Sequence, residues 1–438
     1  MRLQKHFKIV IAVFTRLEKF LTDRRARGVL MAACLLPFML GAWLVWALPQ
    51  SPDVWYYKHW SRLVTRHGIS AAYSGQPVVD FVDYPPVLLY PWRVEGEIYR
   101  CCVDPTFDEE TMVENEWHTF GLASIAVIFH VATGLALYWL TKQRHTARTA
   151  TAVATVYLLN PAALYNVAYL GLPDSAHSLW LVLAFGLGEL ASLRASWVFA
   201  TLAALTKPQA WGLLPLFAWR RFFADGAKKT FGGIFVGVVT AAVVAAPFIF
   251  QGKLLTLVTL PLHMGDVQAV VSAQAHNLWW LVTTGDGLKM KDSAPLFGAV
   301  SYQHASLVLL AMSGFFTLWC ARGASAARLL VLPAYQAFAW FCLTTRAHEN
   351  HWFFVLPLLA LALPGERKMF PVFVAVTATG FINLLLHDEH FGPQLIAHLT
   401  ATVMQFLQLA NCVVNVSLLV VWTAWLVRTQ KVSGAAAS

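Results

Sequence analysis

Charged residues are scarce in this sequence. Only 13% of its 438 residues are Asp, Glu, Lys or Arg, whereas 58% are hydrophobic and the mean hydropathy is +0.57. A soluble domain is about a quarter charged, so the composition excludes an ordinary soluble protein and predicts a membrane protein. The formal charge of +9 does not indicate nucleic-acid binding, because the basic residues cluster beside apolar runs, as membrane topology requires.

Cysteine motifs and internal repeats are also missing. Four of the six cysteines lie in apolar segments, and the other two, Cys101 and Cys102, are adjacent in a polar loop without the spacing of a zinc site. No repeat of 20–50 residues is visible and the two halves of the sequence do not mirror each other. Because many transporters are built from repeats, this absence argues against a transporter.

Apolar runs long enough to cross a bilayer recur along the chain, which predicts an all-α polytopic membrane protein with about 10–12 transmembrane or re-entrant helices. A basic amphipathic segment, 1–27, precedes them and is expected at the cytoplasmic surface; residues 28–438 are expected to form a single transmembrane domain. The expected spans are 28–49, 118–140, 149–170, 174–191, 229–250, 302–321, 326–344, 351–364, 369–387 and 395–427.

The apolar run 196–219 is interrupted by Lys207 and Pro208. Each half, at about 16 Å of helix, is too short to cross a core of about 30 Å. If the run enters and returns on one side, the later basic clusters fall on the cytoplasmic side, as the positive-inside rule demands. We therefore expect a broken helical hairpin with Lys207 near its tip, inside the membrane.

The same assignment of spans to the membrane places the long, acidic loops on the non-cytoplasmic side. The first of them, 50–117, contains eleven acids against five Lys or Arg, and we expect it to be an external catalytic loop. The other segments on this side are 171–174, 251–301, 346–351 and 387–390.

Two acids in the first external loop stand out. Asp80 lies three residues before Asp83, which directly precedes Tyr84 and two prolines. Prolines restrict the backbone of the preceding residue, so the direction of the Asp83 side chain would be well defined. The simpler alternative is a turn that ends an interfacial helix.

Three other positions combine charge with an apolar context. Lys207 is either a snorkelling lysine or a functional charge inside the membrane. Asp174 precedes the fourth span and is either a helix cap or a site residue. The segment that contains Arg346, His348 and Glu349 is a solvated helix end, an anion site or, lacking a third ligand, a weak zinc candidate.

Taken in order, these motifs resemble the GT-C superfamily of integral-membrane glycosyltransferases. The likeness is to dolichyl-phosphate-glucose glucosyltransferases and their bacterial polyprenyl-phosphate-sugar relatives. It rests on Asp83-Tyr-Pro-Pro86, Gly171-Leu-Pro-Asp174-Ser175, Lys207-Pro-Gln-Ala210 and His348-Glu349. The eukaryotic enzymes usually carry Lys where this chain has Asn350, which leaves the sugar open.

The resemblance implies an inverting transfer of a hexose, mannose or glucose, from a polyprenyl- or dolichyl-phosphate carrier to a glycan or glycolipid acceptor. Asp83 would be the catalytic base. The implied binding residues are Asp80, Tyr84, Asp174, Lys207, Arg346, His348 and Glu349. Because the leaving phosphate needs no protonation and cations are at hand, no cofactor is expected, although a divalent metal stays open.

Two kinds of alternative remain at this level. One is a protein-directed glycosyltransferase of the same superfamily; the other is a polytopic lipid or sugar transporter, or a noncatalytic scaffold. The expected location is an integral, multi-pass position in a bacterial plasma membrane, with the endoplasmic reticulum membrane as the other possibility.

Overall fold

The computed structural model describes residues 2–21, 23–48, 51–73, 82–190, 192–322 and 324–435. Within these ranges the protein is almost entirely α-helical, with one two-stranded antiparallel sheet. The helices are α1 Arg2–Phe20, α2 Asp23–Ala47, α3 Pro52–His67, α4 Leu89–Cys102, α5 Glu109–Glu114, α6 Glu116–Lys142, α7 Ala147–Leu158, α8 Pro161–Leu164, α9 Asp174–Glu189, α10 Leu193–Ala204, α11 Leu214–Asp225, α12 Ala227–Phe250, α13 Leu254–Val267, α14 Leu278–Val282, α15 Tyr302–Ala321, α16 Ala326–Leu343, α17 Val355–Ala362, α18 Phe370–His387, α19 Phe391–His398 and α20 Ala401–Ala435. The short elements are the 3-10 helices η1 Ile69–Tyr73, η2 Pro86–Leu88, η4 Pro208–Leu213, η5 Gly287–Lys289 and η6 Arg367–Met369, the π-helix η3 Tyr165–Tyr169, and the strands β1 Pro295–Phe297 and β2 Val300–Ser301.

Seven helices in the described part of the chain are long and apolar enough to cross a membrane. They confirm the predicted all-α, multi-pass membrane protein. These spans are 24–47, 116–142, 227–250, 302–321, 326–343, 367–387 and 401–430.

The remaining three predicted spans are shorter or broken. The run 149–170 stops at Leu158, because Pro161 has no N–H to donate and its ring disfavours a helical residue before it. Asn160 caps the restart by accepting from the backbone N–H groups of Ala162 and Ala163. Helices α9 and α17 have 16 and eight residues, or about 24 and 12 Å. All of α17 and most of α9 are buried, so these helices fill the centre of the bundle.

Close helix packing surrounds α9. It contacts α6 and α10, and α10 in turn packs on α12. Gly186 on α9 lies against Leu140 of α6 so closely that an added Cβ would collide with the leucine side chain. Small residues at such contacts let helix backbones approach one another where lipid supplies no hydrophobic driving force. The C-terminal part of α9 is therefore packed closely on α6.

The segment after the first span folds into its own helical unit of α3, η1, η2, α4 and α5. An aromatic cluster holds it together, in which the rings of Tyr57 and Trp92 stack at 5.3 Å. Below the cluster, Glu95 accepts a hydrogen bond from Ser61 at 2.9 Å and pairs with His118 of α6 at 3.2 Å. These contacts fix the acidic loop to the first residues of α6.

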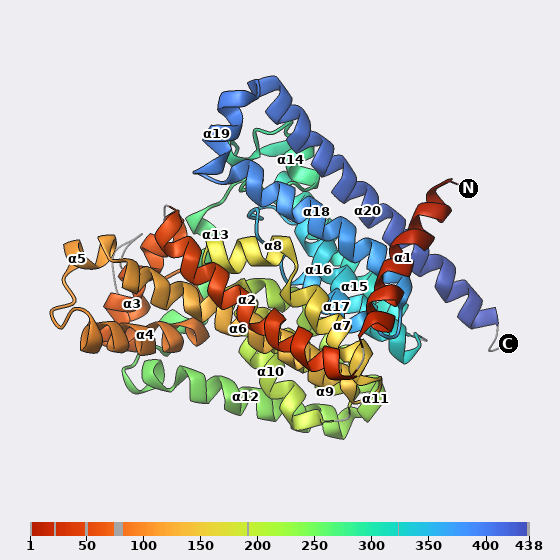
Figure 1. The fold of residues 1–438 in the computed structure, drawn as a ribbon, viewed down its shortest axis with the longest axis horizontal. Helices are drawn as coiled ribbons and strands as arrows, with labels where there is room; N and C mark the ends of the chain where they lie inside the picture. Colours follow the sequence, from red (N-terminus) through yellow and green to blue (C-terminus); the bar gives the residue numbers. More distant parts are fainter. Residues whose placement is uncertain are drawn as a thin grey trace.

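The five segments predicted to be external contact one another. In Figure 1, α3, α4 and α5 gather at the left, whereas α11 and both chain termini lie at the right. The bonds that join the five segments are Asn350–Asp174 at 2.9 Å, Arg346–Asp292 at 2.6 Å, His276–His387 at 3.0 Å and Lys253–Ser70 at 3.0 Å.

The basic residues predicted to be cytoplasmic are linked separately. Arg220 pairs with Glu189, and Arg144 donates to the Glu189 carbonyl. In the same way, Arg367 near the start of α18 pairs with Glu18 of α1 at 2.8 Å, where Phe14 of α1 packs on Phe370 with ring centroids 5.2 Å apart. The N-terminal helix thus covers the end of the bundle that carries the basic residues.

This separation predicts the topology. Ser293 is exposed in the segment between α14 and α15 and should face the non-cytoplasmic side. In a cysteine-free background, Ser293→Cys should therefore react with a membrane-impermeant maleimide in intact cells. Arg194→Cys, exposed at the start of α10, should react only after the membrane is opened. Protection of Ser293→Cys in intact cells would reverse the assignment of sides.

Candidate functional site

The turn that carries Asp83 is docked on the broken helix. Pro85 has φ −60° and ψ 162°, so the chain is extended as it enters η2. The Tyr73 hydroxyl donates to the Tyr84 carbonyl at 2.7 Å, and the Val87 N–H donates to the Leu205 carbonyl at 3.0 Å. Because Leu205 follows the last residue of α10, the turn is fixed beside Lys207.

Asp83 itself has an unused carboxylate oxygen. Oδ1 is buried and has no hydrogen-bond partner in the part of the chain that the structure describes. Burial raises the pKa of Asp83 to about 6, although the positive charge of Lys207 acts in the opposite direction. Buried carboxylate oxygens are normally satisfied, so this one is available to a ligand proton.

Lys207 sits where α10 breaks. Its backbone is extended, with φ −148° and ψ 141°, because the following Pro208 disfavours the helical conformation. The side chain is 4% exposed, and its Nζ lies 2.5 Å from Oδ1 of Asp174 and 5.1 Å from the centre of the Tyr84 ring. The lysine therefore does not snorkel to water but is paired inside the bundle.

Asp174 accepts bonds from three different segments. It is the first residue of α9, whose cap position is Pro173, so it is not the helix cap. Besides Lys207, it binds the side-chain amides of Asn166 at 3.1 Å and Asn350 at 2.9 Å, both through Oδ2. Asn166 lies in the π-helix η3, a local widening that is frequent at functional sites. The sequence analysis noted Asn350 only as a departure from the GT-C pattern and did not single out Asn166, so neither was predicted as a site residue.

His348 and Glu349 lie near the same charges. The backbone of His348 bridges to Ala273 and Gln274, which anchors the segment. Burial raises the pKa of Glu349 to about 8, with a further contribution from the negative charge of Asp53, and it lowers the pKa of His348 to about 4. Glu349 is therefore protonated and His348 neutral at pH 7.

Asp53 is a further acid in this group. It lies in the first turn of α3. Burial raises its pKa to about 6, Lys207 lowers it, and Asp83 and Asp174 raise it. An acid in the first turn of a helix is so ordinary that the sequence offered no signal for it.

Arg346 has a different partner. Its backbone has φ +61°, and its guanidinium donates from Nε at 2.6 Å and from Nη2 at 3.3 Å to Asp292, which is 1% exposed. Such a bidentate pair fixes the direction of an arginine. The remaining sequence candidate, Asp80, lies outside the described residues. Over the described ranges, no group of three or more His, Cys, Asp or Glu side chains could hold a metal ion.

Comparison with known proteins gives little beyond these contacts. No family model matches the chain, and no curated protein matches it. Among solved structures, the chain is similar to the oligosaccharyltransferase of Archaeoglobus fulgidus, crystallised with a tethered acceptor peptide, at 15% identity and a TM-score of 0.43. The likeness covers 88% of this chain and 55% of that one. A likeness of this degree carries no weight on activity, so the function has to be inferred from the residues.

The Lys207–Asp174 pair has a measurable consequence for stability. Lys207→Met would leave the Asp174 carboxylate without its cation, and removing one partner of a buried pair typically costs about 3–5 kcal/mol. We expect a clearly lower midpoint of thermal unfolding for the purified variant. The double variant Lys207→Met/Asp174→Asn should recover most of that loss, because no buried charge is left unpaired. A single variant as stable as wild type would contradict the pairing.

Proposed function

We propose that this protein is an inverting glycosyltransferase of the GT-C type. It would move a hexose, mannose or glucose, from a polyprenyl-phosphate carrier to a lipid-linked or envelope glycan on the non-cytoplasmic side. The observation that carries the proposal is the unpartnered Oδ1 of Asp83, held on a proline-rigid turn beside the buried Lys207–Asp174 pair. The resemblance of the motifs to GT-C enzymes supplies the reaction class.

The reaction needs one base and no acid. An acceptor hydroxyl oxygen attacks the anomeric carbon of the donor sugar, and the bond from that carbon to the phosphate oxygen breaks. The hydroxyl proton passes to the Asp83 carboxylate, while the phosphate leaves with the bonding electrons and without a proton. A single displacement inverts the configuration at the anomeric carbon. This role needs Asp83 ionised, which its pKa of about 6 permits at neutral pH.

The leaving phosphate would be met by Lys207. An ammonium has three donors, and Asp174 uses one of them. If Lys207 turns partly toward a phosphate, Asp174 still accepts hydrogen bonds from Asn166 and Asn350. The Asp174 carboxylate therefore keeps hydrogen-bond partners while the lysine contacts the phosphate. The protonated Glu349 adds no negative charge that would repel the donor. Arg346, held by Asp292, is the second cation proposed to stabilise the phosphate.

Replacement of the base tests the central assignment. Asp83→Asn keeps the size of the side chain but cannot take the acceptor proton, and general-base catalysis is worth about 10²–10⁴-fold. Transfer from radiolabelled polyprenyl-phosphate mannose or glucose should fall by that order, with donor affinity nearly unchanged. Asp80→Asn, the neighbouring acid, should have a smaller effect. Normal turnover by Asp83→Asn would refute the proposal, and a larger loss at Asp80 would move the base to that residue.

The pH profile provides an independent test. Because burial raises the pKa of Asp83 to about 6, acidification protonates the base at a higher pH than it would a free aspartate. The rate of transfer should therefore fall as the pH drops through about 6. The residual rate of Asp83→Asn should lack this limb. Asp53→Asn is the matched control: its own pKa is also raised to about 6, yet its loss should leave the limb in place.

A further inference from the structure

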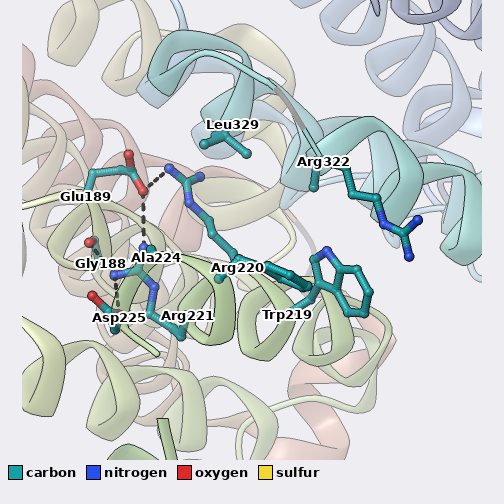
Figure 2. A pocket seen from close by; sticks show the side chains of 11 residues that line it. Gly188, Glu189, Trp219, Arg220, Arg221, Ala224, Asp225, Arg322 and Leu329 are labelled. Atoms are coloured by element: carbon teal, nitrogen blue, oxygen red, sulfur yellow. Dashed lines mark hydrogen bonds and ion pairs between the residues drawn. The ribbon is translucent and has the colours of Figure 1, made fainter. Parts of the chain in front are cut away.

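A second cluster of buried charges lies at the other end of α9. There the last residues of α9, the second half of α11, the end of α15 and the start of α16 enclose a cavity of about 670 Å³ (Figure 2). Glu189 is the last residue of α9 and Asp174 the first, so about 22 Å of helix separates the two acids. The cavity is therefore distinct from the site around Lys207.

The arginines of this cavity are buried but only partly satisfied. Arg220 and Arg221 are 7% and 3% exposed. Arg220 pairs with Glu189, and Arg221 donates to the Gly188 carbonyl at 2.6 Å. Arg221 also forms ion pairs with Asp225 at 3.2 Å and Glu189 at 3.5 Å, although Oδ2 of Asp225 accepts no hydrogen bond within the described residues. Nevertheless, among the described residues, Nε and Nη1 of Arg220 and Nε of Arg221 have no hydrogen-bond partner.

These three nitrogens carry four N–H donors, one on each Nε and two on Nη1. A buried N–H donor without a hydrogen bond costs free energy, and in native proteins such donors are usually satisfied by the protein, a ligand or water. Figure 2 shows the Arg220 guanidinium between Glu189 and Leu329, at the wall of the cavity. The donors are thus concentrated in a space large enough for a ligand.

The charge and surroundings of the cavity favour an anion. Arg220, Arg221 and Arg322 outnumber Glu189 and Asp225 by one charge. Arg322 lies over the Trp219 ring, with Cζ 5.2 Å from its centre. Phe222 and Phe223 on α11 are 45% and 64% exposed, so an apolar surface borders the cavity.

We propose that this cavity binds a phosphate group on the side of the membrane opposite the glycosyl-transfer site. Phosphate offers several strong acceptor oxygens, and arginine recognises it through paired N–H donors. The phosphate belongs either to an anionic lipid headgroup that enters from the interface or to a free phosphate compound. The proposal does not depend on the activity assigned to Asp83.

Two ligands distinguish these sources. The full-length protein, purified in detergent, would be titrated with inorganic pyrophosphate and, separately, with short-chain phosphatidylglycerol, with phosphatidylcholine as the lipid control. Native mass spectrometry would count bound lipid, and calorimetry would measure pyrophosphate. We expect at least one of the two anions to bind with defined stoichiometry.

The variant Arg220→Gln/Glu189→Gln is the main comparison, because it keeps the net charge and leaves Arg221 its contacts with the Gly188 carbonyl and Asp225. It should weaken binding about ten- to a hundredfold, the usual effect of losing a charged hydrogen bond. Arg322→Gln, whose side chain has no acid to leave unpaired within the described residues, should also weaken it. Arg194→Gln removes a charge outside the cavity and should leave the affinity unchanged.

Each outcome has a defined meaning. Binding of phosphatidylglycerol alone identifies the lipid as the source, and binding of pyrophosphate alone identifies a free phosphate compound. No binding of either anion, or equal affinity of wild type and the double variant, would overturn the proposal. Equal weakening by Arg194→Gln would also overturn it, since general attraction of anions to a basic surface would then explain the result.

Discussion

The buried pair of Lys207 and Asp174 constrains the rest of this structure. An unpaired charge inside an apolar bundle is expensive, so the break after α10 and the start of α9 have to meet, as they do at 2.5 Å. The break frees the Leu205 carbonyl for the Val87 N–H. The Asp83 turn is thereby attached beside the buried cation of Lys207. The position of the Asp83 turn in the external loop thus depends on the pairing of Lys207 with Asp174 inside the membrane domain.

The same network explains why one acid differs from the others. Asp174 accepts hydrogen bonds from a lysine and two asparagines, and Asp292 accepts them from a bidentate arginine. Burial keeps Glu349 protonated near neutral pH. Asp83 alone among these four combines a pKa near 6 with a buried oxygen that has no partner in the described structure. The carboxylate oxygen of Asp83 that has no partner is therefore the one to which the proposed reaction assigns the acceptor proton.

The sequence predicted what depends on local chemistry. Long apolar runs identified the seven spans, and Lys207 with Pro208 marked the break, because a proline and a charge each disfavour a continuous membrane helix. What it missed depends on tertiary contacts. Asn166 and Asn350 are ordinary polar residues until Asp174 lies between them, and nothing near Asp292 in the sequence indicates Arg346, 54 residues later. The sequence did not predict the breaks at Asn160 and within 351–364. These runs are mostly apolar, so their composition could not show that the helices within them are short and central.

Helix α9 and the broken segment that follows it form a frame closed at both ends. At one end Asp174 holds Lys207; at the other Glu189 holds Arg220, which follows Lys207 by 13 residues in the chain. The chain from 193 to 225 thus starts near the end of α9 that carries Glu189, reaches Asp174 at the other end, and returns to Glu189. A frame held by an ion pair at each end resists displacement of the backbone at Lys207, so in the proposed reaction only the end of the lysine side chain has to turn toward the phosphate. Such preorganisation is what makes a fixed charge effective on a developing one. It also means that any ligand that draws Arg220 away from Glu189 would loosen the end of the frame opposite the Asp83 turn.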